Sequence, residues 1–70
     1  MTREEIEREI NDLEAYVQRK QDAIDSLIAR YDGARPSWVS GEIGWDMMHI
    51  QNARAEIEDL KAKLEAETAQ

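Results

Sequence analysis

Two runs of apolar residues, each at alternating spacings of three and four, dominate this sequence and flank a short segment that contains Gly33 and Pro36. The spacing marks one face of an α-helix, whereas strand side chains alternate with a period of two. Glycine tolerates the left-handed conformation that ends a helix, and proline has no N–H with which to continue one. We therefore predict an all-α chain whose two long helices fold back into an antiparallel, coiled-coil-like hairpin.

The first stripe predicts a helix over about residues 3–32. Thr2 occupies the N-cap position with Glu5 three residues later, as in a capping box. The apolar members of the stripe are Ile6, Ile10, Leu13, Val17, Ile24, Leu27 and Tyr31. Lys20 is the polar member, and we interpret it as a register device whose aliphatic stem lies along the seam while its ammonium group reaches water.

The second stripe predicts a helix over about residues 42–68, after a loop of about residues 33–41. Ser37 and Ser40 are both candidate N-caps for it, so its first residue stays open. The members of this stripe are Ile43, Met47, Ile50, Ala53, Ile57, Leu60 and Leu64. The whole chain is expected to be one helical-hairpin domain.

A single register brings the two predicted stripes together in nearly every layer. Residues whose numbers sum to about 74 face each other in it, so that Leu27 lies near Met47. The same rule places Lys20 opposite Ala53, where a small side chain leaves room for the lysine stem.

The predicted hairpin is too small to bury much apolar surface, and the 70-residue chain has no cysteine to form a disulfide or a thiolate zinc site. Self-association would compensate, most simply as a homodimer that forms a four-helix bundle, or as a higher oligomer. A weaker stripe on the second helix supplies the predicted oligomer interface: Met48, Ala55, Ala62 and Ala66. The alternative is that these alanines only favour the helix.

The charge is acidic and uneven. Sixteen acidic against nine basic residues give a net charge of -7, which argues against direct binding to nucleic acid or to anionic membranes. Residues 1–14 and 55–70 carry the excess, whereas residues 15–54 are balanced. In a hairpin the termini therefore form an acidic end, which serves solubility or, alternatively, imitates a nucleic acid.

Little in the sequence points to catalysis or to a cofactor. The chain has no cysteine nucleophile, no serine with an evident base and no glycine-rich phosphate loop. Glu42, Asp46 and His49 share a helix edge that could ligate a metal, but the first helix has no carboxylate on its stripe to complete such a site. We predict no enzyme, no metal and no other cofactor.

The loop end carries the best candidates for a binding site. Tyr31, Arg35, Trp38 and Trp45 belong to the residue types that dominate protein-binding hot spots. A small anionic ligand such as a nucleotide could use the same set. The alternative is that the tryptophans only close the end of the hairpin.

These features predict a small, non-enzymatic interaction protein that binds and blocks or tethers a protein partner. Its size and composition are typical of inhibitors encoded by phages and other mobile elements, which is an analogy and not a motif match. The alternatives are a structural coiled-coil oligomerisation module, a nucleotide-binding sponge and an acidic nucleic-acid mimic. The first residues have no signal-peptide pattern, so a cytoplasmic location is expected.

Overall fold

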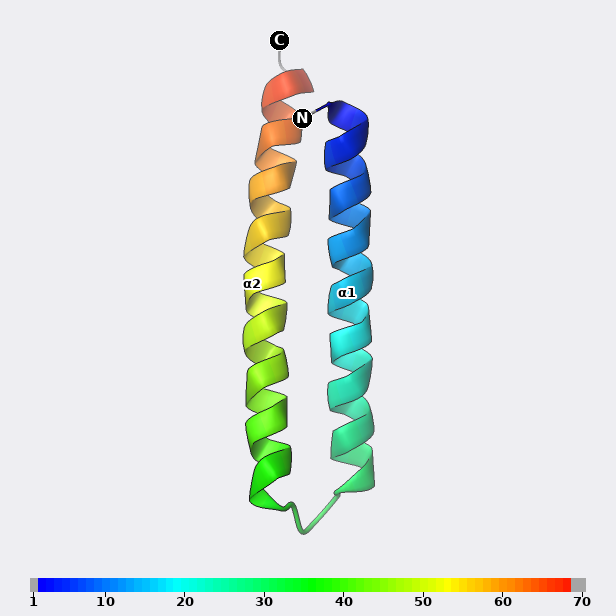
Figure 1. The fold of residues 1–70 in the computed structure, drawn as a ribbon, viewed down its shortest axis with the longest axis vertical. Coiled ribbons are helices and arrows are strands. Elements are labelled where there is room, and N and C mark those ends of the chain that lie inside the picture. Colours follow the sequence, from blue (N-terminus) through cyan, green and yellow to red (C-terminus); the bar gives the residue numbers. More distant parts are fainter. Residues whose placement is uncertain (1, 69–70) are drawn as a thin grey trace.

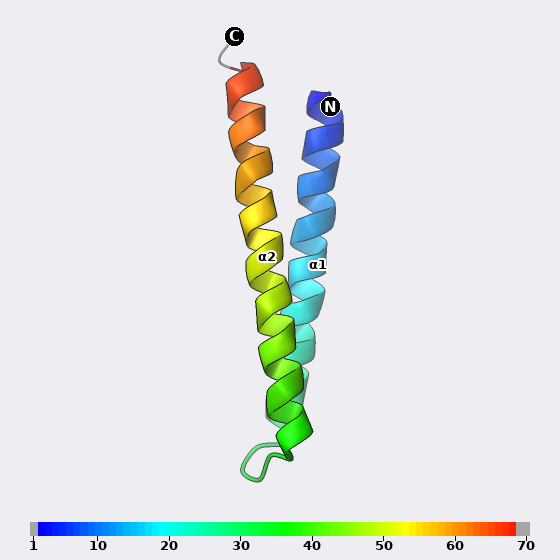
Figure 2. The same cartoon turned by 60° about the vertical axis from the view of Figure 1, so that its left-hand side comes forward.

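The computed structural model of the chain describes residues 2–68, which form two helices and one connecting loop. Helix α1 spans Arg3–Arg30 and helix α2 spans Ser37–Thr68. They run antiparallel side by side along a rod of 55 × 14 × 14 Å, with the loop at one end and the first and last turns at the other (Figures 1 and 2). The predicted all-α antiparallel hairpin is confirmed.

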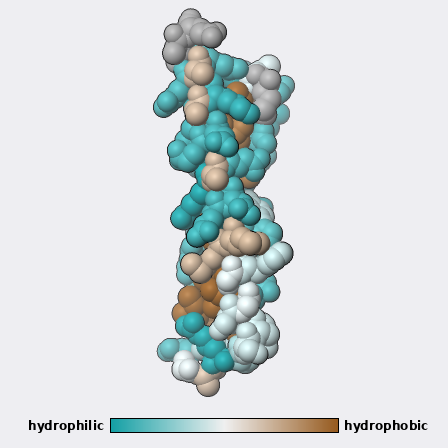
Figure 3. Space-filling view, turned by 90° about the vertical axis from the view of Figure 1, so that its left-hand side faces the viewer, coloured by the Kyte–Doolittle hydropathy of each residue, from teal (hydrophilic) through white to brown (hydrophobic). Residues whose placement is uncertain are grey.

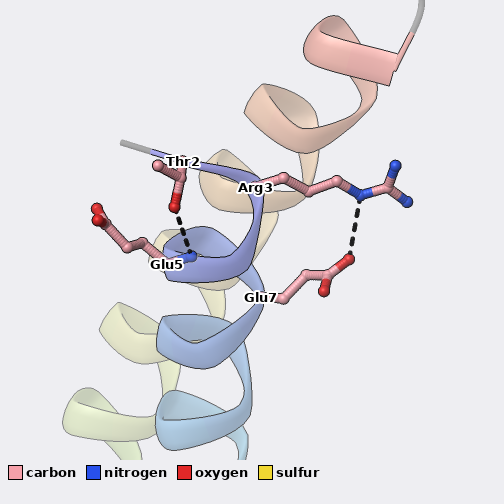
Figure 4. Close-up of polar contacts among 4 residues, drawn as sticks. All are labelled: Thr2, Arg3, Glu5 and Glu7. Carbon is pink, nitrogen blue, oxygen red and sulfur yellow. Dashed lines mark hydrogen bonds and ion pairs between the residues drawn. The ribbon is translucent and has the colours of Figure 1, made fainter.

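Both ends of α1 follow from local sequence signals. The side-chain oxygen of Thr2 accepts a hydrogen bond from the backbone N–H of Glu5 at 3.2 Å (Figure 4), as the capping pattern predicted. Arg3 forms an exposed ion pair with Glu7 at 3.3 Å, which adds little stability. At the other end the helix stops two residues earlier than expected, and Gly33 has a φ of 105°, in the region that favours glycine.

Helix α2 begins at Ser37, about five residues before the expected boundary, so the loop covers only residues 31–36. Pro36 directly precedes the helix, and its carbonyl accepts the N–H of Val39 at 3.0 Å. Proline suits this place, because its φ is already helical and the first turn needs no N–H from it. Val39 is fully buried and anchors the first turn in the core, so Ser40 lies inside the helix and is not its cap.

The core-facing seam of α2 contains Asp46 where Met47 was expected. Met47 is 50% exposed, whereas Asp46 is 3% exposed. A seam that begins at Val39 continues four residues later at Ile43 and three residues after that at Asp46. The earlier start of the helix therefore places the aspartate, and not Met47, on the seam. The members of the seam are Val39, Ile43, Asp46, Ile50, Ala53, Ile57, Leu60 and Leu64.

The register between the helices also differs from the expected one. Lys20 pairs with Asp46 and Tyr31 contacts Trp38, so the numbers of facing residues sum to about 66–69 and not to about 74. The cause is that the loop lies earlier in the chain than expected, because the midpoint of a hairpin loop fixes which residues face each other further along. Lys20 therefore does not lie opposite Ala53.

The apolar core is concentrated toward the end that bears the termini. There the helices bury Ile6, Ile10, Ile57 and Leu60, and further partly buried side chains pack against this cluster: Leu13, Val17 and Leu64. Ile24, Val39 and Ile50 are buried nearer the loop. Tyr16, Lys20, Asp46 and His49 form a polar layer, with Ile50 on the side of the terminal core and with Ile24 and Val39 on the side of the loop.

Candidate binding surfaces

The loop end brings three of the four predicted binding residues into one small region. The rings of Tyr31 and Trp38 meet edge to face, with centroids 5.5 Å apart and planes at 83°. Trp38 is nonetheless 57% exposed. Arg35 lies between them in the loop, is exposed, and forms no side-chain hydrogen bond or ion pair with any described residue. This loop-end cluster of Tyr31, Arg35 and Trp38 offers an accessible indole and a free guanidinium group.

Trp45, the fourth predicted binding residue, is not part of that cluster. It lies seven residues beyond Trp38 on α2, about 10 Å along the helix axis. Its ring packs edge to face against His49, with centroids 4.9 Å apart, and the residue is 58% exposed. Trp45 therefore lies apart from the loop-end cluster, in the half of the rod near the loop.

The polar layer contains an ion pair that the sequence analysis missed. Lys20 Nζ lies 3.2 Å from Asp46 Oδ1, and the exposed fractions of the two side chains are 31% and 4%. The same ammonium group lies 5.7 Å from the ring centroid of Tyr16, within the range of a cation–π contact. The alternation from Val39 through Ile43 to Asp46 was the sequence signal that could have revealed this partner.

His49 completes the polar layer from the side of α2. Tyr16 Oη lies 3.2 Å from His49 Nδ1, while Nε2 is buried and has no hydrogen-bond partner among the described residues. If the tyrosine hydroxyl donates to Nδ1, the proton of the neutral ring is on Nε2. His49 thus packs between the helices with one nitrogen bonded.

The predicted helix edge of Glu42, Asp46 and His49 does not converge on a point. Asp46 turns to Lys20, His49 turns to Tyr16, and Glu42 is exposed. Within residues 2–67, no three His, Cys, Asp or Glu side chains lie close enough together to hold a metal ion.

The face of α2 that points away from α1 carries the predicted oligomer interface. Met48 is 42% exposed, and the three alanines of that interface are exposed as well. They belong to a longer row at spacings of three and four, which we call the outer stripe: Gly41, Trp45, Met48, Asn52, Ala55, Asp59, Ala62 and Ala66. Figure 3 shows this side of the molecule, with a line of hydrophobic patches between hydrophilic ones and a less hydrophilic surface toward the loop.

The acidic segments lie next to one another at the end opposite the loop, as the hairpin fold requires (Figure 1). Neither helix, over the described residues, is long and apolar enough to cross a membrane. Comparison of the chain with known protein families, with curated proteins and with solved structures finds no match. The loop-end cluster and the outer stripe are therefore the two surfaces from which a function can be argued.

Proposed function

We propose that this protein is a non-enzymatic, acidic interaction protein whose loop end binds a protein partner and thereby blocks or tethers it. The observation that supports this function best is the exposure of Trp38, which is 57%, beside the free guanidinium of Arg35. Tryptophan and arginine dominate the energetics of protein interfaces, because they bury large surfaces and form directional contacts.

Trp38 is also held in place before any partner arrives. It stands in the first turn of α2, where the neighbouring Val39 is fully buried, and its ring rests on Tyr31. A side chain that is already ordered loses less conformational entropy when it is covered. The loop end therefore presents a fixed aromatic anchor.

The shape and charge of the rod support blocking or tethering as the mode of action. The backbone of the molecule is only 14 Å across, and its aromatic tip, where Asp32 and Arg35 balance each other, lies far from the acidic end. A narrow tip can enter a cleft on a partner, while the acidic body disfavours non-specific association with other acidic surfaces. Small inhibitors from phages and other mobile elements provide the analogy for this mode.

Affinity capture with the purified chain tests the loop-end function. Trp38→Ala and Arg35→Ala should each weaken retention of a specific partner by roughly 30-fold, the effect of losing a hot-spot residue. Arg54→Ala, which removes an exposed arginine from the middle of α2, is the matched control and should retain the partner. Circular dichroism should show unchanged helicity in all three variants.

Two outcomes would contradict the loop-end function. A partner that is held equally by all variants would bind elsewhere on the rod. Loss of helicity in Trp38→Ala would show that the indole serves the fold, as in the interpretation that the aromatic residues only close the hairpin.

A second candidate function is that of a coiled-coil oligomerisation module, and the outer stripe favours it. Trp45, Met48 and three alanines of this row are exposed, and apolar residues at heptad spacing favour packing against another helix. Under this function Met48, Ala55, Ala62 and Ala66 lie between subunits. Ala62→Glu should then lower the mass in solution, whereas Ala15→Glu, on the outer face of α1, should not.

A further inference from the structure

The outer stripe has the spacing of a complete second seam. Its eight residues alternate by three and four from Gly41 to Ala66, and all of them are exposed. Two of them are large apolar side chains, Trp45 at 58% and Met48 at 42% exposure. Since α1 covers the opposite face of α2, no other part of the described chain packs on this stripe.

We propose that a second copy of this chain covers the outer stripe in an antiparallel arrangement. In the proposed register Gly41 faces Ala66 of the second copy, and Trp45 faces Ala62 of the second copy. The two α2 helices then lie in the centre and the two α1 helices lie outside. This inference rests on the second candidate function and specifies its partner and geometry.

The sizes of the side chains favour the antiparallel direction. Large side chains, Trp45 and Met48, occupy the half of the stripe near the loop, and alanines dominate the other half. An antiparallel copy places Trp45 on Ala62 and Met48 on Asp59 of the second copy, so that each large apolar side chain meets a smaller one. A parallel copy would stack Trp45 on Trp45 and Asp59 on Asp59, with like charges in contact.

The charged residues beside the stripe select the register. Four exposed or partly exposed residues follow one edge of it at intervals of seven: Glu42, His49, Glu56 and Lys63. In the proposed register Glu42 lies opposite Lys63 of the second copy, whereas His49 adds no contact to Glu56 of the second copy because its ring nitrogens face Tyr16 and the interior. If the second copy were shifted by one heptad, two glutamates would face each other. Glu42 would lie opposite Glu56 of the second copy after a shift in one direction, and Glu56 would lie opposite its own counterpart after a shift in the other.

The overall charge favours the same direction. Each copy has a net charge of -7, which comes from the segments at the end of the termini. Parallel copies would place these ends together, whereas antiparallel copies place the acidic end of each copy beside the loop half of the other.

Cross-linking can test the direction and the register together, because the chain has no cysteine of its own. Two variants are required, Gly41→Cys and Ala66→Cys, and a side chain at residue 41 meets no atom within 4 Å. Mild oxidation of the mixed variants should give the heterodisulfide, because the two sites face each other at disulfide distance. Either variant alone should stay largely uncross-linked.

Disulfides within each variant alone would indicate a parallel dimer and overturn the antiparallel arrangement. A dimer by light scattering without any of these cross-links would overturn the register but keep the oligomerisation function. A monomer at all concentrations would overturn both, and it would leave the loop-end function to its own capture experiment.

A charge exchange tests the edge contacts. Lys63→Glu should weaken the dimer by roughly tenfold, because each dimer loses two ion pairs and gains two repulsions. Adding Glu42→Lys should restore the affinity. Lys61→Glu, which makes the same change on an exposed lysine outside the edge, should have a much smaller effect. Equal effects of the two lysine variants, or no rescue, would overturn the proposed register.

Discussion

Replacing Lys20 and replacing Asp46 should have unequal costs, although the two residues form one ion pair. Lys20 Nζ lies 3.2 Å from Asp46 Oδ1, but 31% of the lysine side chain is exposed and only 4% of the aspartate side chain is. Without Asp46, the flexible lysine can turn its ammonium group to water. Without Lys20, the aspartate remains a carboxylate buried between the helices.

The magnitudes follow from this difference in exposure. Removal of one partner from a buried ion pair typically costs about 3–5 kcal/mol, because the remaining charge is uncompensated. We expect about 3 kcal/mol for Lys20→Met and less than about 1 kcal/mol for Asp46→Leu, since partial exposure of the pair lowers both values. Lys20→Met should then lower the melting temperature by about 12–24 °C, given about 4–8 °C per kcal/mol for a domain of this size.

The double variant provides the decisive comparison. Lys20→Met combined with Asp46→Leu places two apolar side chains in the layer, and an apolar replacement of a buried pair is often neutral or stabilising. We expect the double variant to be at least as stable as the native chain. The double-mutant cycle then gives the coupling energy between the two positions.

Thermal and urea unfolding, followed by helical circular dichroism, measure these effects. All variants must be compared at one protein concentration, because self-association raises the apparent stability. Equal costs for the two single variants, or a larger cost for Asp46→Leu, would refute the reasoning. Equal costs would mean that neither group reaches water better than the other, and a larger cost for Asp46→Leu would mean that the ammonium of Lys20 is the group that cannot reach water.

Three further predictions concern single positions, and thermal unfolding checks each of them. Gly33→Ala should destabilise the chain by about 1 kcal/mol because φ is 105° there, and an unchanged midpoint would argue against a left-handed residue in the loop. Val39→Ala should cost about 2 kcal/mol and Met47→Ala less than about 0.5 kcal/mol, and the reverse order would restore Met47 to the seam. Tyr16→Phe should cost about 1 kcal/mol, since it removes the hydroxyl that bonds His49, and a neutral effect would show that this bond adds no net stability.

The features of α1 could be predicted because they depend on residues close together in the chain. The Thr2 cap involves a backbone N–H three residues away, and the stripe from Ile6 to Tyr31 follows directly from the helical repeat. The positive φ of Gly33, shortly after the helix end at Arg30, is equally local. Tyr31 and Trp38 were both predicted at the loop end because they lie close together in the chain, and their rings do meet there.

The errors arose where a residue had to be assigned across the two helices. Either Asp46 or Met47 can follow Ile43 at an allowed spacing, and hydrophobicity favoured the methionine. The choice depends on whether Val39 belongs to the helix, which in turn depends on how the first turn of α2 docks. Because Val39 is buried in the first turn, the helix begins earlier than expected. This start places Asp46 on the seam, where it forms the ion pair with Lys20.

The sequence by itself determined the two helices, the capped start of the first and the acidic end, because these follow from local geometry and composition. The tertiary structure alone decided which residues face one another: Lys20 meets Asp46, and Trp45 lies with His49 away from the loop-end cluster. Such pairings are set by the docking of one helix on the other. If the position of the loop changes by a few residues, every pair of facing residues along the two helices changes with it. No short-range pattern in the sequence specifies that position.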